Sequence, residues 1–380
     1  MTGYAGARVA MIFPSKQPLA PNQWSGTPFG LKGGFESLGA EVVPIGHFFP
    51  PGVRQAEAAL ARIGGRRGAD ADRAPSRVSA RRWSFQRQLN HAGALDLVLA
   101  MVTEGYRLGD LRVSCPVVTY DDGTYQQIWR HPDSDVANGG FAERDVQRWI
   151  RTQRDSLRAA DVACVSTDWA KQSVVDDYGV PADRVAVVGM GHRPRTLSEA
   201  GRDWSVPTFL FVGVDWRRKN GDRVLRAFDS LRAEVPGATL HLVGEHEPVR
   251  APGVVDHGLL HKNDPVAQAT LDELFARATA FVLPSLFDPS PIAYLEAASV
   301  GLPVIATSQG GAGSLLGEAA LVVDPHDDEA ILGAMRTVAD PDTAQRMGAA
   351  ALLASREASW TAVAERILRA GTTPRATRSS

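Results

Sequence analysis

The chain has 380 residues, of which 44% are hydrophobic and 22% charged, and its formal net charge at pH 7 is −2. This length suits two domains, and the near-neutral charge argues against a general nucleic-acid-binding protein. No apolar run approaches the roughly 18 residues of a membrane-spanning helix, and the N-terminus lacks the apolar core of a signal peptide. We expect a globular, cytoplasmic protein with no transmembrane segment and no nucleic-acid partner. Its two cysteines, Cys115 and Cys164, form no C-x-x-C pair and are expected to be buried free thiols.

The first half of the chain alternates short apolar runs with helical segments. Continuous apolar runs of this kind are typical of parallel strands that are buried on both faces of a sheet. The runs cover residues 8–13, 41–45, 95–102, 116–120, 162–165 and 184–188. We therefore expect an N-terminal Rossmann-like domain over residues 1–195.

A glycine-containing turn follows the first of these strands. Thr27 is predicted to cap a helix that begins at Pro28, and Gly26 leaves room for a close backbone approach. A plain capped helix and a binding loop both fit this pattern. The turn is not a G-x-G-x-x-G motif, so a nicotinamide site is not expected.

An arginine-rich stretch occupies residues 54–87, with nine arginines and three acidic residues. A solvated face is one interpretation. The other is a peripheral contact with a membrane surface or an anionic acceptor. Removing the charges at Arg66, Arg67, Arg81 and Arg82 tests this second hypothesis.

Two acidic motifs follow. Asp121 and Asp122 come directly after a predicted strand, where they form either an Asp-Gly turn or part of a site at the sheet edge. Asp133 and Asp135 form a D-x-D triplet with no strand in front of it, which favours a loop over a metal site. The nine histidines show no ligand spacing, so no metal is expected.

A polar linker is predicted over residues 196–207, and a second series of apolar runs follows it. These runs cover residues 208–212, 239–243, 280–283, 303–306 and 320–323. The series predicts a second Rossmann-like domain over residues 208–356. A last helix is expected over 357–371 and a disordered tail over 372–380.

A basic triplet lies where the first strand of this second series gives way to a helix. Arg217, Arg218 and Lys219 bring positive charge to a turn just ahead of a helix N-terminus. Such a place suits a diphosphate. The alternative is a solvated basic turn.

Two carboxylates, Asp288 and Glu296, stand eight positions apart around a helix start. Ser290 is predicted to cap this helix and Pro291 to be its first residue. Glu296 would then lie roughly 7–8 Å further along the helix axis. Each carboxylate can accept hydrogen bonds from one pair of hydroxyls, and the helix N-terminus between them favours an anion. The pattern suits an extended ligand with a diol at each carboxylate and an anion between them, and a sugar, a diphosphate and a ribose in a row is such a ligand.

This motif, continued by Glu296-Ala-x-x-x-Gly301-x-Pro303-Val, resembles the E-x7-E signature of family-four retaining glycosyltransferases of the GT-B fold, the glycosyl transferases group 1. The resemblance implies an α/β fold with two Rossmann-like doubly wound domains facing across a cleft. The C-terminal helix would cross back to the N-terminal domain. It also implies retaining transfer of a hexose-type sugar from a nucleoside diphosphate sugar to an acceptor hydroxyl, with no metal or cofactor.

The resemblance assigns roles to the residues of the motif. Asp288 would hold the donor sugar together with Ser290, Pro291 and Ile292, and Glu296 would hold the ribose. The acceptor stays open between a sugar, a lipid, a natural product and a protein.

The remaining roles concern the phosphates and the reacting carbon. Lys219 and Arg218 would bind the diphosphate and stabilise the charge of the leaving group, with Gly26 near the phosphates. Asp121, with Asp122 as the alternative, would contact the donor sugar near the reacting carbon.

Three positions depart from the pattern of the resembled family. Asp288 replaces the first Glu, Val214 stands where many members have Arg, and Ser314 stands where many have Glu. These departures motivate a second hypothesis, a non-catalytic glycosyltransferase-like partner protein. A GT-B phosphorylase is a third.

Overall fold

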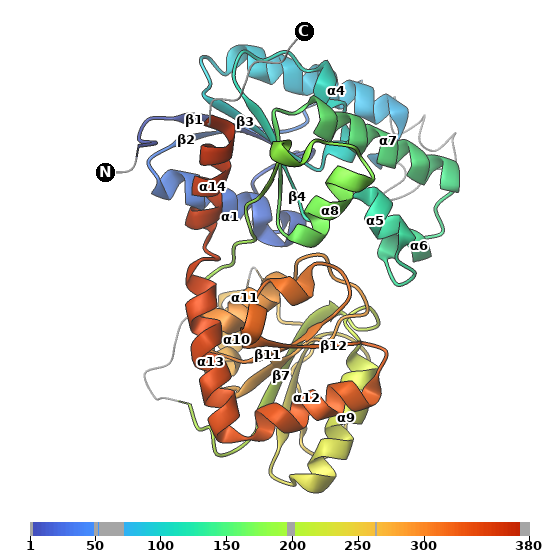
Figure 1. Cartoon of the computed structure of the whole chain (residues 1–380), viewed down its shortest axis with the longest axis vertical. Coiled ribbons are helices and arrows are strands. Elements are labelled where there is room, and N and C mark those ends of the chain that lie inside the picture. Colours follow the sequence, from blue (N-terminus) through green and yellow to red (C-terminus); the bar gives the residue numbers. More distant parts are fainter. Residues whose placement is uncertain (1–2, 49–51, 53–71, 196–201, 263, 373–380) are drawn as a thin grey trace. The chain divides into compact units, whose positions relative to one another are not determined.

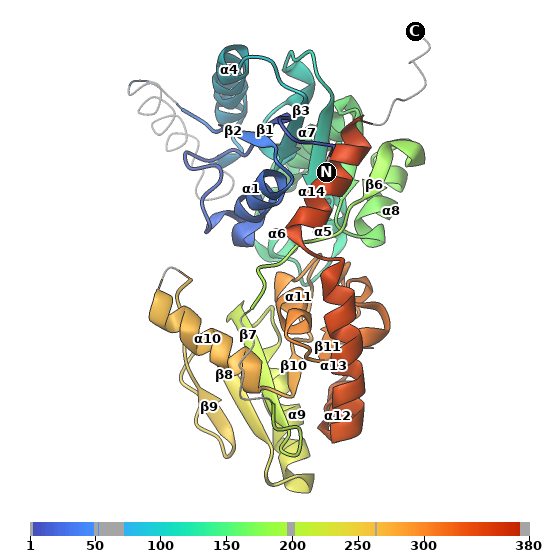
Figure 2. The same cartoon turned by 90° about the vertical axis from the view of Figure 1, so that its left-hand side faces the viewer.

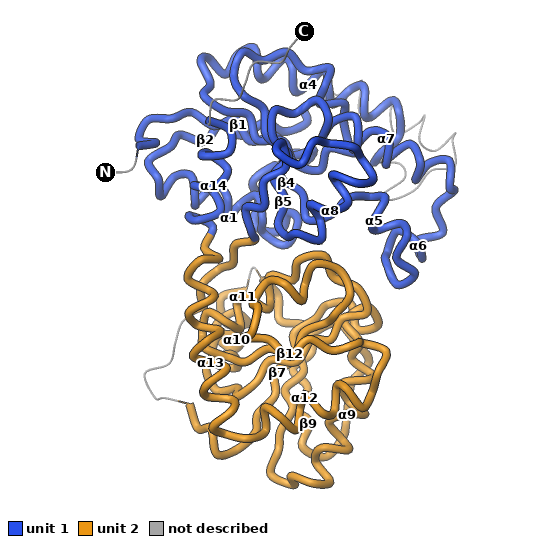
Figure 3. The backbone as a smooth tube through the Cα atoms, in the orientation of Figure 1, with its two compact units in different colours: residues 1–189, 360–380 blue, residues 190–359 orange. Residues whose placement is uncertain are grey.

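The computed structural model describes residues 3–48, 52, 72–195, 202–262 and 264–372. The predicted disordered tail and most of the predicted linker lie outside these residues. The chain forms two compact units, residues 1–189 with 360–380 and residues 190–359, shown in two colours in Figure 3. The sequence placed the corresponding boundaries near residues 195 and 356. Within the described residues, no helix combines the length and apolarity that crossing a membrane requires.

Unit 1 is built on a parallel sheet with the strand order β2-β1-β3-β4-β5-β6 (Figure 1). All five neighbouring pairs are parallel, as the continuous apolar runs predicted. The strands are β1 (Arg8–Ile12), β2 (Glu41–Ile45), β3 (Leu97–Met101), β4 (Val117–Asp121), β5 (Val162–Val165) and β6 (Val185–Val187). Every residue of β3 and β5 is buried, because helices cover both faces of the sheet.

The helices of unit 1 are α1 (Thr27–Ser37), α4 (Pro75–His91), α5 (Tyr125–Arg130), α6 (Asp135–Asn138), α7 (Glu143–Ala159), α8 (Asp168–Asp176) and α14 (Trp360–Thr372). Short 3₁₀ turns lie at Gln23–Gly26, Thr103–Gly105, Leu108–Asp110 and Ala182–Arg184. Asp135 of the D-x-D triplet begins α6, and Ser134 caps this helix by accepting from the Ala137 N–H at 3.0 Å. The triplet is therefore a helix start and not a plain loop.

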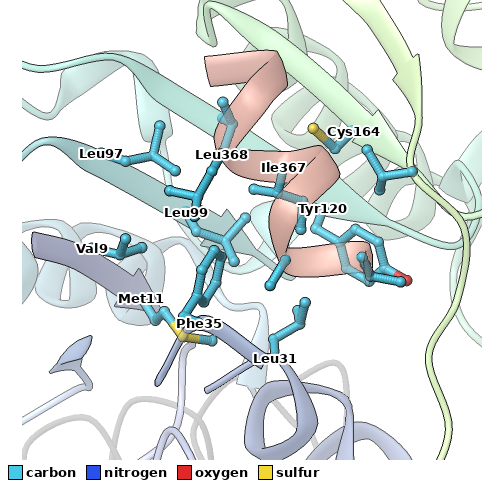
Figure 4. Packing of buried hydrophobic residues seen from close by; sticks show 14 of the residues in the cluster. Val9, Met11, Leu31, Phe35, Leu97, Leu99, Tyr120, Cys164, Ile367 and Leu368 are labelled. Carbon is cyan, nitrogen blue, oxygen red and sulfur yellow. The ribbon is translucent and has the colours of Figure 1, made fainter. Parts of the chain in front are cut away.

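The last helix, α14, belongs to unit 1 although it follows the whole of unit 2 in sequence. Figure 4 shows Ile367 and Leu368 of α14 in the same buried cluster as Val9 and Leu99 of the sheet. On α1, a Cβ at Gly30 would lie 2.2 Å from Nε1 of Trp360. A glycine is thus needed where α1 and α14 touch.

Unit 2 contains a second parallel sheet with the order β12-β11-β10-β7-β8-β9 (Figure 2). Its strands are β7 (Thr208–Asp215), β8 (Thr239–Glu245), β9 (Val254–Asp256), β10 (Ala280–Val282), β11 (Val304–Thr307) and β12 (Ala320–Val323). Its helices are α9 (Gly221–Glu234), α10 (Pro265–Arg277), α11 (Ile292–Ser299), α12 (Asp328–Ala339) and α13 (Pro341–Arg356), with 3₁₀ turns at Ala312–Ser314 and Gly317–Ala319. The prediction of two Rossmann-like α/β domains is confirmed.

The chain enters and leaves unit 2 through neighbouring segments. His192 forms a parallel bridge with Ser359. The His192 ring nitrogen Nδ1 lies 2.8 Å from the carbonyl oxygen of Ala358. This histidine is buried, which lowers its pKa. These contacts indicate that His192 has a structural role.

Of the two free cysteines, Cys164 is buried in β5, as expected. Cys115 is only half-buried, so the expectation of full burial is wrong for this residue.

Candidate functional site

The basic turn of unit 2 begins at the end of β7 and leads into α9. The Lys219 N–H donates to the Asp215 carbonyl at 2.8 Å, and the Arg218 N–H donates to the Asp215 carboxylate at 3.0 Å. Asn220, with φ of +67°, reverses the chain before α9. Its buried amide donates to the carbonyl oxygens of Pro284 at 3.0 Å and Pro325 at 2.7 Å. The turn is therefore fixed by the ends of other elements.

Two glycines give the turn its shape. A Cβ on Gly213 would lie 2.7 Å from Cγ of Lys219, so the lysine stem packs against the bare backbone of β7. A Cβ on Gly221 would lie 2.4 Å from the Trp216 ring. The lysine is consequently held along the strand end, with only 13% of its side chain exposed.

The first carboxylate of the acidic motif meets this turn. The Lys219 ammonium donates to Oδ2 of Asp288, and Nη1 of Arg218 lies 3.6 Å from the same oxygen. The Leu286 N–H also donates to the Arg218 carbonyl at 2.8 Å. Burial lowers the pKa of Lys219, and the Asp288 carboxylate opposes that effect. The structure thus brings together three of the predicted site residues.

Gly310 fixes the backbone of Asp288 from the other side. Its φ is +84°, and a Cβ at this position would lie 2.2 Å from the Asp288 carbonyl oxygen. Only glycine fits this close approach in the left-handed region. The acidic loop is therefore clamped between the basic turn and the segment after β11.

Helix α11 starts one residue later than predicted. Its first residue is Ile292 and Pro291 occupies the cap position, so the prediction of Ser290 as the cap and Pro291 as the first helical residue is wrong. Pro291 has an extended ψ of 109°, which the proline ring permits without continuing the helix. After Asp288 and Pro289, Ser290 and Pro291 are buried and Ile292 is half-buried.

Gly301 closes the C-terminal end of α11. Gly301 has φ of +71°, and its N–H donates to the Ala298 carbonyl at 2.9 Å. The Leu302 N–H donates to the Ala297 carbonyl at 3.1 Å, which completes a Schellman motif. Tyr294, on the buried face, donates to the Leu283 carbonyl at 2.7 Å and anchors the helix to the sheet.

The second carboxylate, Glu296, carries a partner that the sequence analysis missed. Nη2 of Arg195 donates to Oε2 of Glu296 at 3.0 Å, and Nη1 donates to Asp272 at 3.0 Å. Burial lowers the pKa of Arg195, but the Glu296 and Asp272 carboxylates outweigh it, so the pKa is raised. Arg195 was predicted to end the N-terminal domain, whereas it lies in unit 2. Arg195 and Glu296 are 101 residues apart in the sequence, so no local pattern could predict that they pair.

In unit 1, Gly26 is the cap residue of α1 with φ of +93°, and Thr27 is the first helical residue. The prediction of Thr27 as the cap is therefore wrong by one position. Trp24 and Ser25 also have positive φ values. The chain reverses through three consecutive left-handed residues before the helix begins.

Asp121 occupies the end of β4, as predicted, but it does not reach an exposed edge. Its side chain is buried, with the residue 5% exposed, and Oδ1 accepts from the Gln153 amide at 3.3 Å. Oδ2 has no hydrogen-bond partner among the described residues. Burial, followed by the charge of Glu104, raises the pKa of Asp121 well above its usual value. Asp122 is half-buried.

The two other departures from the motif lie at the surface of unit 2. Val214 is exposed at the end of β7. Ser314 is exposed, and its hydroxyl donates to the Gly311 carbonyl at 2.9 Å. Neither side chain supplies a charge to the basic turn.

Comparison with known proteins agrees with this geometry. The glycosyl transferases group 1 family matches residues 206–340, which contain the basic turn and both carboxylates. The chain carries a glycosyl transferases group 1 domain. A D-inositol 3-phosphate glycosyltransferase from Acidothermus cellulolyticus is 29% identical over an alignment of 268 positions that covers 63% of this chain. The chain spans only 59% of that relative's length.

Solved structures resemble this chain over both units. The sucrose-phosphate synthase of Thermosynechococcus elongatus has a TM-score of 0.63 at 16% identity, with 95% of this chain and 97% of that chain covered. WaaG, a glycosyltransferase involved in lipopolysaccharide biosynthesis, has a TM-score of 0.65 at 17% identity, with 97% and 100% covered. At these identities the likeness shows the GT-B fold alone.

Proposed function

We propose that this protein transfers a hexose-type sugar from a nucleoside diphosphate sugar to an acceptor hydroxyl, with retention of anomeric configuration and without a metal or other cofactor. The convergence of Lys219 and Arg218 on Asp288, within a glycosyl transferases group 1 domain, carries this proposal. The relatives are named as glycosyltransferases, which agrees with it.

The two cations are the proposed binding groups for the diphosphate. A diphosphate brings more negative charge than the single carboxylate that they contact in the free protein. As the phosphates take up Lys219 and Arg218, the carboxylate of Asp288 becomes available to the sugar hydroxyls. Charge that develops on the leaving diphosphate would then be stabilised by groups already in place. This supplies positive charge without a metal ion.

The start of α11 and Glu296 complete the proposed donor site. The backbone N–H groups of Ser290 and Ile292 lie at the positive end of the helix, which favours the phosphates. Oε2 of Glu296 is held by Arg195, and Oε1 makes no hydrogen bond within the described part of the chain. Oε1 is therefore available to the ribose hydroxyls. Gly26 and Asp121 or Asp122 of unit 1 remain proposed contacts.

We propose that α4 of this protein contacts an anionic membrane surface on the acceptor side of the reaction. Residues 54–71 of the arginine-rich stretch lie outside the described residues. On α4, Arg82 and Trp83 are exposed, and the Arg87 guanidinium lies 5.7 Å from the Trp83 ring centre. An exposed tryptophan beside arginines suits an anionic membrane surface. Arg81 is buried against Asp72, so the prediction that included it in this surface is wrong.

We also propose a cytoplasmic location. The two free thiols, Cys115 and Cys164, suit a reducing compartment.

A transfer assay tests the proposal. The protein is incubated with a panel of nucleoside diphosphate sugars and sugar, lipid and polyol acceptors, and nucleoside diphosphate release is measured with and without a chelator. We expect release that depends on the acceptor, resists the chelator and yields a product with the donor's anomeric configuration by NMR. Inversion would overturn the retaining assignment, and loss of activity with the chelator would overturn metal independence. Phosphate-dependent turnover would instead indicate a phosphorylase. Nucleotide binding without turnover would favour the non-catalytic partner.

A further inference from the structure

Arg195 is held more firmly than an ordinary surface arginine. Only 6% of its side chain is exposed, and its guanidinium lies 5.0 Å from the ring centre of Phe275. Besides Glu296 and Asp272, it donates to the Gln268 amide oxygen at 3.4 Å. Three elements, the segment after His192, α10 and α11, therefore meet at one guanidinium.

The two oxygens of the Glu296 carboxylate have different surroundings, because only Oε2 accepts from Arg195. The planar guanidinium donates from Nη1 to Asp272 and from Nη2 to Glu296, and its contacts with Asp272 and Phe275 fix the direction of the donor that reaches Oε2. With Oε2 fixed, the carboxylate cannot rotate freely, and Oε1 keeps one direction. A carboxylate with one fixed and one open oxygen is already oriented for a diol. Ligand binding therefore loses less side-chain conformational entropy at Glu296.

We infer that Arg195 is a positioning residue for the donor nucleotide: it holds Glu296 by one oxygen so that the other accepts from the ribose hydroxyls. This inference rests on the proposed function, because it takes Glu296 as the ribose contact. It assigns to Arg195 the protein's preference for a ribose over a sugar that lacks these hydroxyls.

Another arginine of unit 2 provides a matched control. Arg202 is half-buried and donates to the carbonyl oxygens of Val300 at 2.9 Å and Gly301 at 3.2 Å, just past the C-terminal end of α11. Its guanidinium lies 4.9 Å from the Trp204 ring centre. Arg202 therefore stabilises the same helix without touching Glu296.

The test compares dissociation constants for a nucleoside diphosphate and its 2′,3′-dideoxy analogue. Calorimetry on the full chain first identifies which of UDP, GDP and ADP the wild type binds. The ratio of the two constants is then measured for Arg195→Met, Arg195→Lys, Arg202→Met and Glu296→Gln. Circular dichroism and thermal unfolding check that each variant is folded.

We expect the wild type to prefer the ribose nucleotide by roughly tenfold or more, as for hydrogen bonds to a charged group. Arg195→Met should bring the ratio close to one, as Glu296→Gln should. Arg195→Lys keeps the positive charge but loses the planar guanidinium, so its ratio should lie between that of the wild type and that of Arg195→Met. Arg202→Met should keep the wild-type ratio even if its unfolding temperature is lower.

Three outcomes would overturn the inference. If Arg195→Met keeps the wild-type ratio of dissociation constants, Arg195 has only a structural role. If the methionine variant does not fold, a wild-type ratio in Arg195→Lys leads to the same conclusion. Tighter binding of both nucleotides by Arg195→Met would make Arg195 an inhibitory plug. A wild type that binds none of the three nucleotides removes the proposed function itself, and that result is seen before any variant is made.

Discussion

Lys219 and Asp288 contact each other across 69 residues of sequence, one from the turn after β7 and the other from the loop before α11. The carboxylate side chain is 9% exposed, so the pair is largely withdrawn from water. The group proposed for the diphosphate and the group proposed for the sugar are thus neighbours before any donor binds. Under the proposed function, donor binding has to redistribute the contacts of this ion pair.

Lys219→Met should lower turnover by about 10² to 10³, the cost of losing one preorganised donor to a developing charge. The matched control is Arg226→Met, which removes an exposed cation of α9 that pairs with Asp328. Steady-state kinetics on both variants with the same donor checks this. Near wild-type turnover in Lys219→Met would remove the phosphate assignment.

Asp288→Asn should destabilise the fold by about 3 kcal/mol, because it leaves the buried Lys219 ammonium without its carboxylate. The double variant Lys219→Met/Asp288→Asn should recover part of that loss, since no buried charge is left unpaired. Urea unfolding of the three variants gives the coupling between the two residues. Additive losses would mean that the ion pair contributes nothing to the fold.

Asp121→Asn should raise the free energy of unfolding at neutral pH by roughly 1–2 kcal/mol. The folded pKa of Asp121 is raised by burial, so the folded state retains a proton that the unfolded state releases. The contribution of Asp121 to stability is therefore complete below about pH 4 and falls as the pH increases. Urea unfolding from pH 4 to pH 8 should show a difference between variant and wild type that grows with pH. A constant difference would contradict the assignment.

Gly30→Ala should destabilise unit 1 by about 1–3 kcal/mol, because the new methyl group would meet the Trp360 ring of α14. Gly33→Ala is its control on the same helix, where a Cβ has nothing within 4 Å. That variant should be stabilised by roughly 0.5–1 kcal/mol through helix propensity alone. Thermal unfolding of the two variants should shift in opposite directions. A shift in the same direction would argue against close packing of α1 and α14.

Arg82→Gln/Arg87→Gln should reduce sedimentation with vesicles that contain anionic lipid, roughly by the 1 kcal/mol that each basic residue contributes near such a surface. Binding of the wild type should weaken as salt is added. Arg144→Gln/Arg151→Gln, which removes two exposed arginines of α7, is the control of equal charge. Equal losses in both double variants would leave α4 with no special role.

The repeated strand pattern could be predicted because its signal is local. Runs such as Leu97–Met101 and Val162–Val165 are apolar throughout, and the structure places them inside a parallel sheet. The strand Val254–Asp256 was missed because it has only three residues, none of them buried, so it carries no apolar run.

The site could be predicted only where residue type and local spacing decide it. The basic turn at Lys219 and the helix start between Asp288 and Glu296 were visible in the sequence, the latter to within one residue. The pairing of Arg195 with Glu296 depends on how distant segments fold together, and the polar residues that follow Arg195 made it look like the last residue of the N-terminal domain. The burial of Asp121 is likewise tertiary, because the residue after an apolar strand is exposed or covered according to what packs above it.

The most direct test of the donor site is thermal unfolding of the purified protein with UDP, GDP, ADP and their sugars, repeated with Lys219→Met and Glu296→Gln. A ligand at about 100 times its dissociation constant adds roughly 2.7 kcal/mol of stability. We predict a shift of several degrees with one base, reduced in both variants. No shift with any nucleotide in the folded wild type, or an equal shift in all three proteins, would contradict the account.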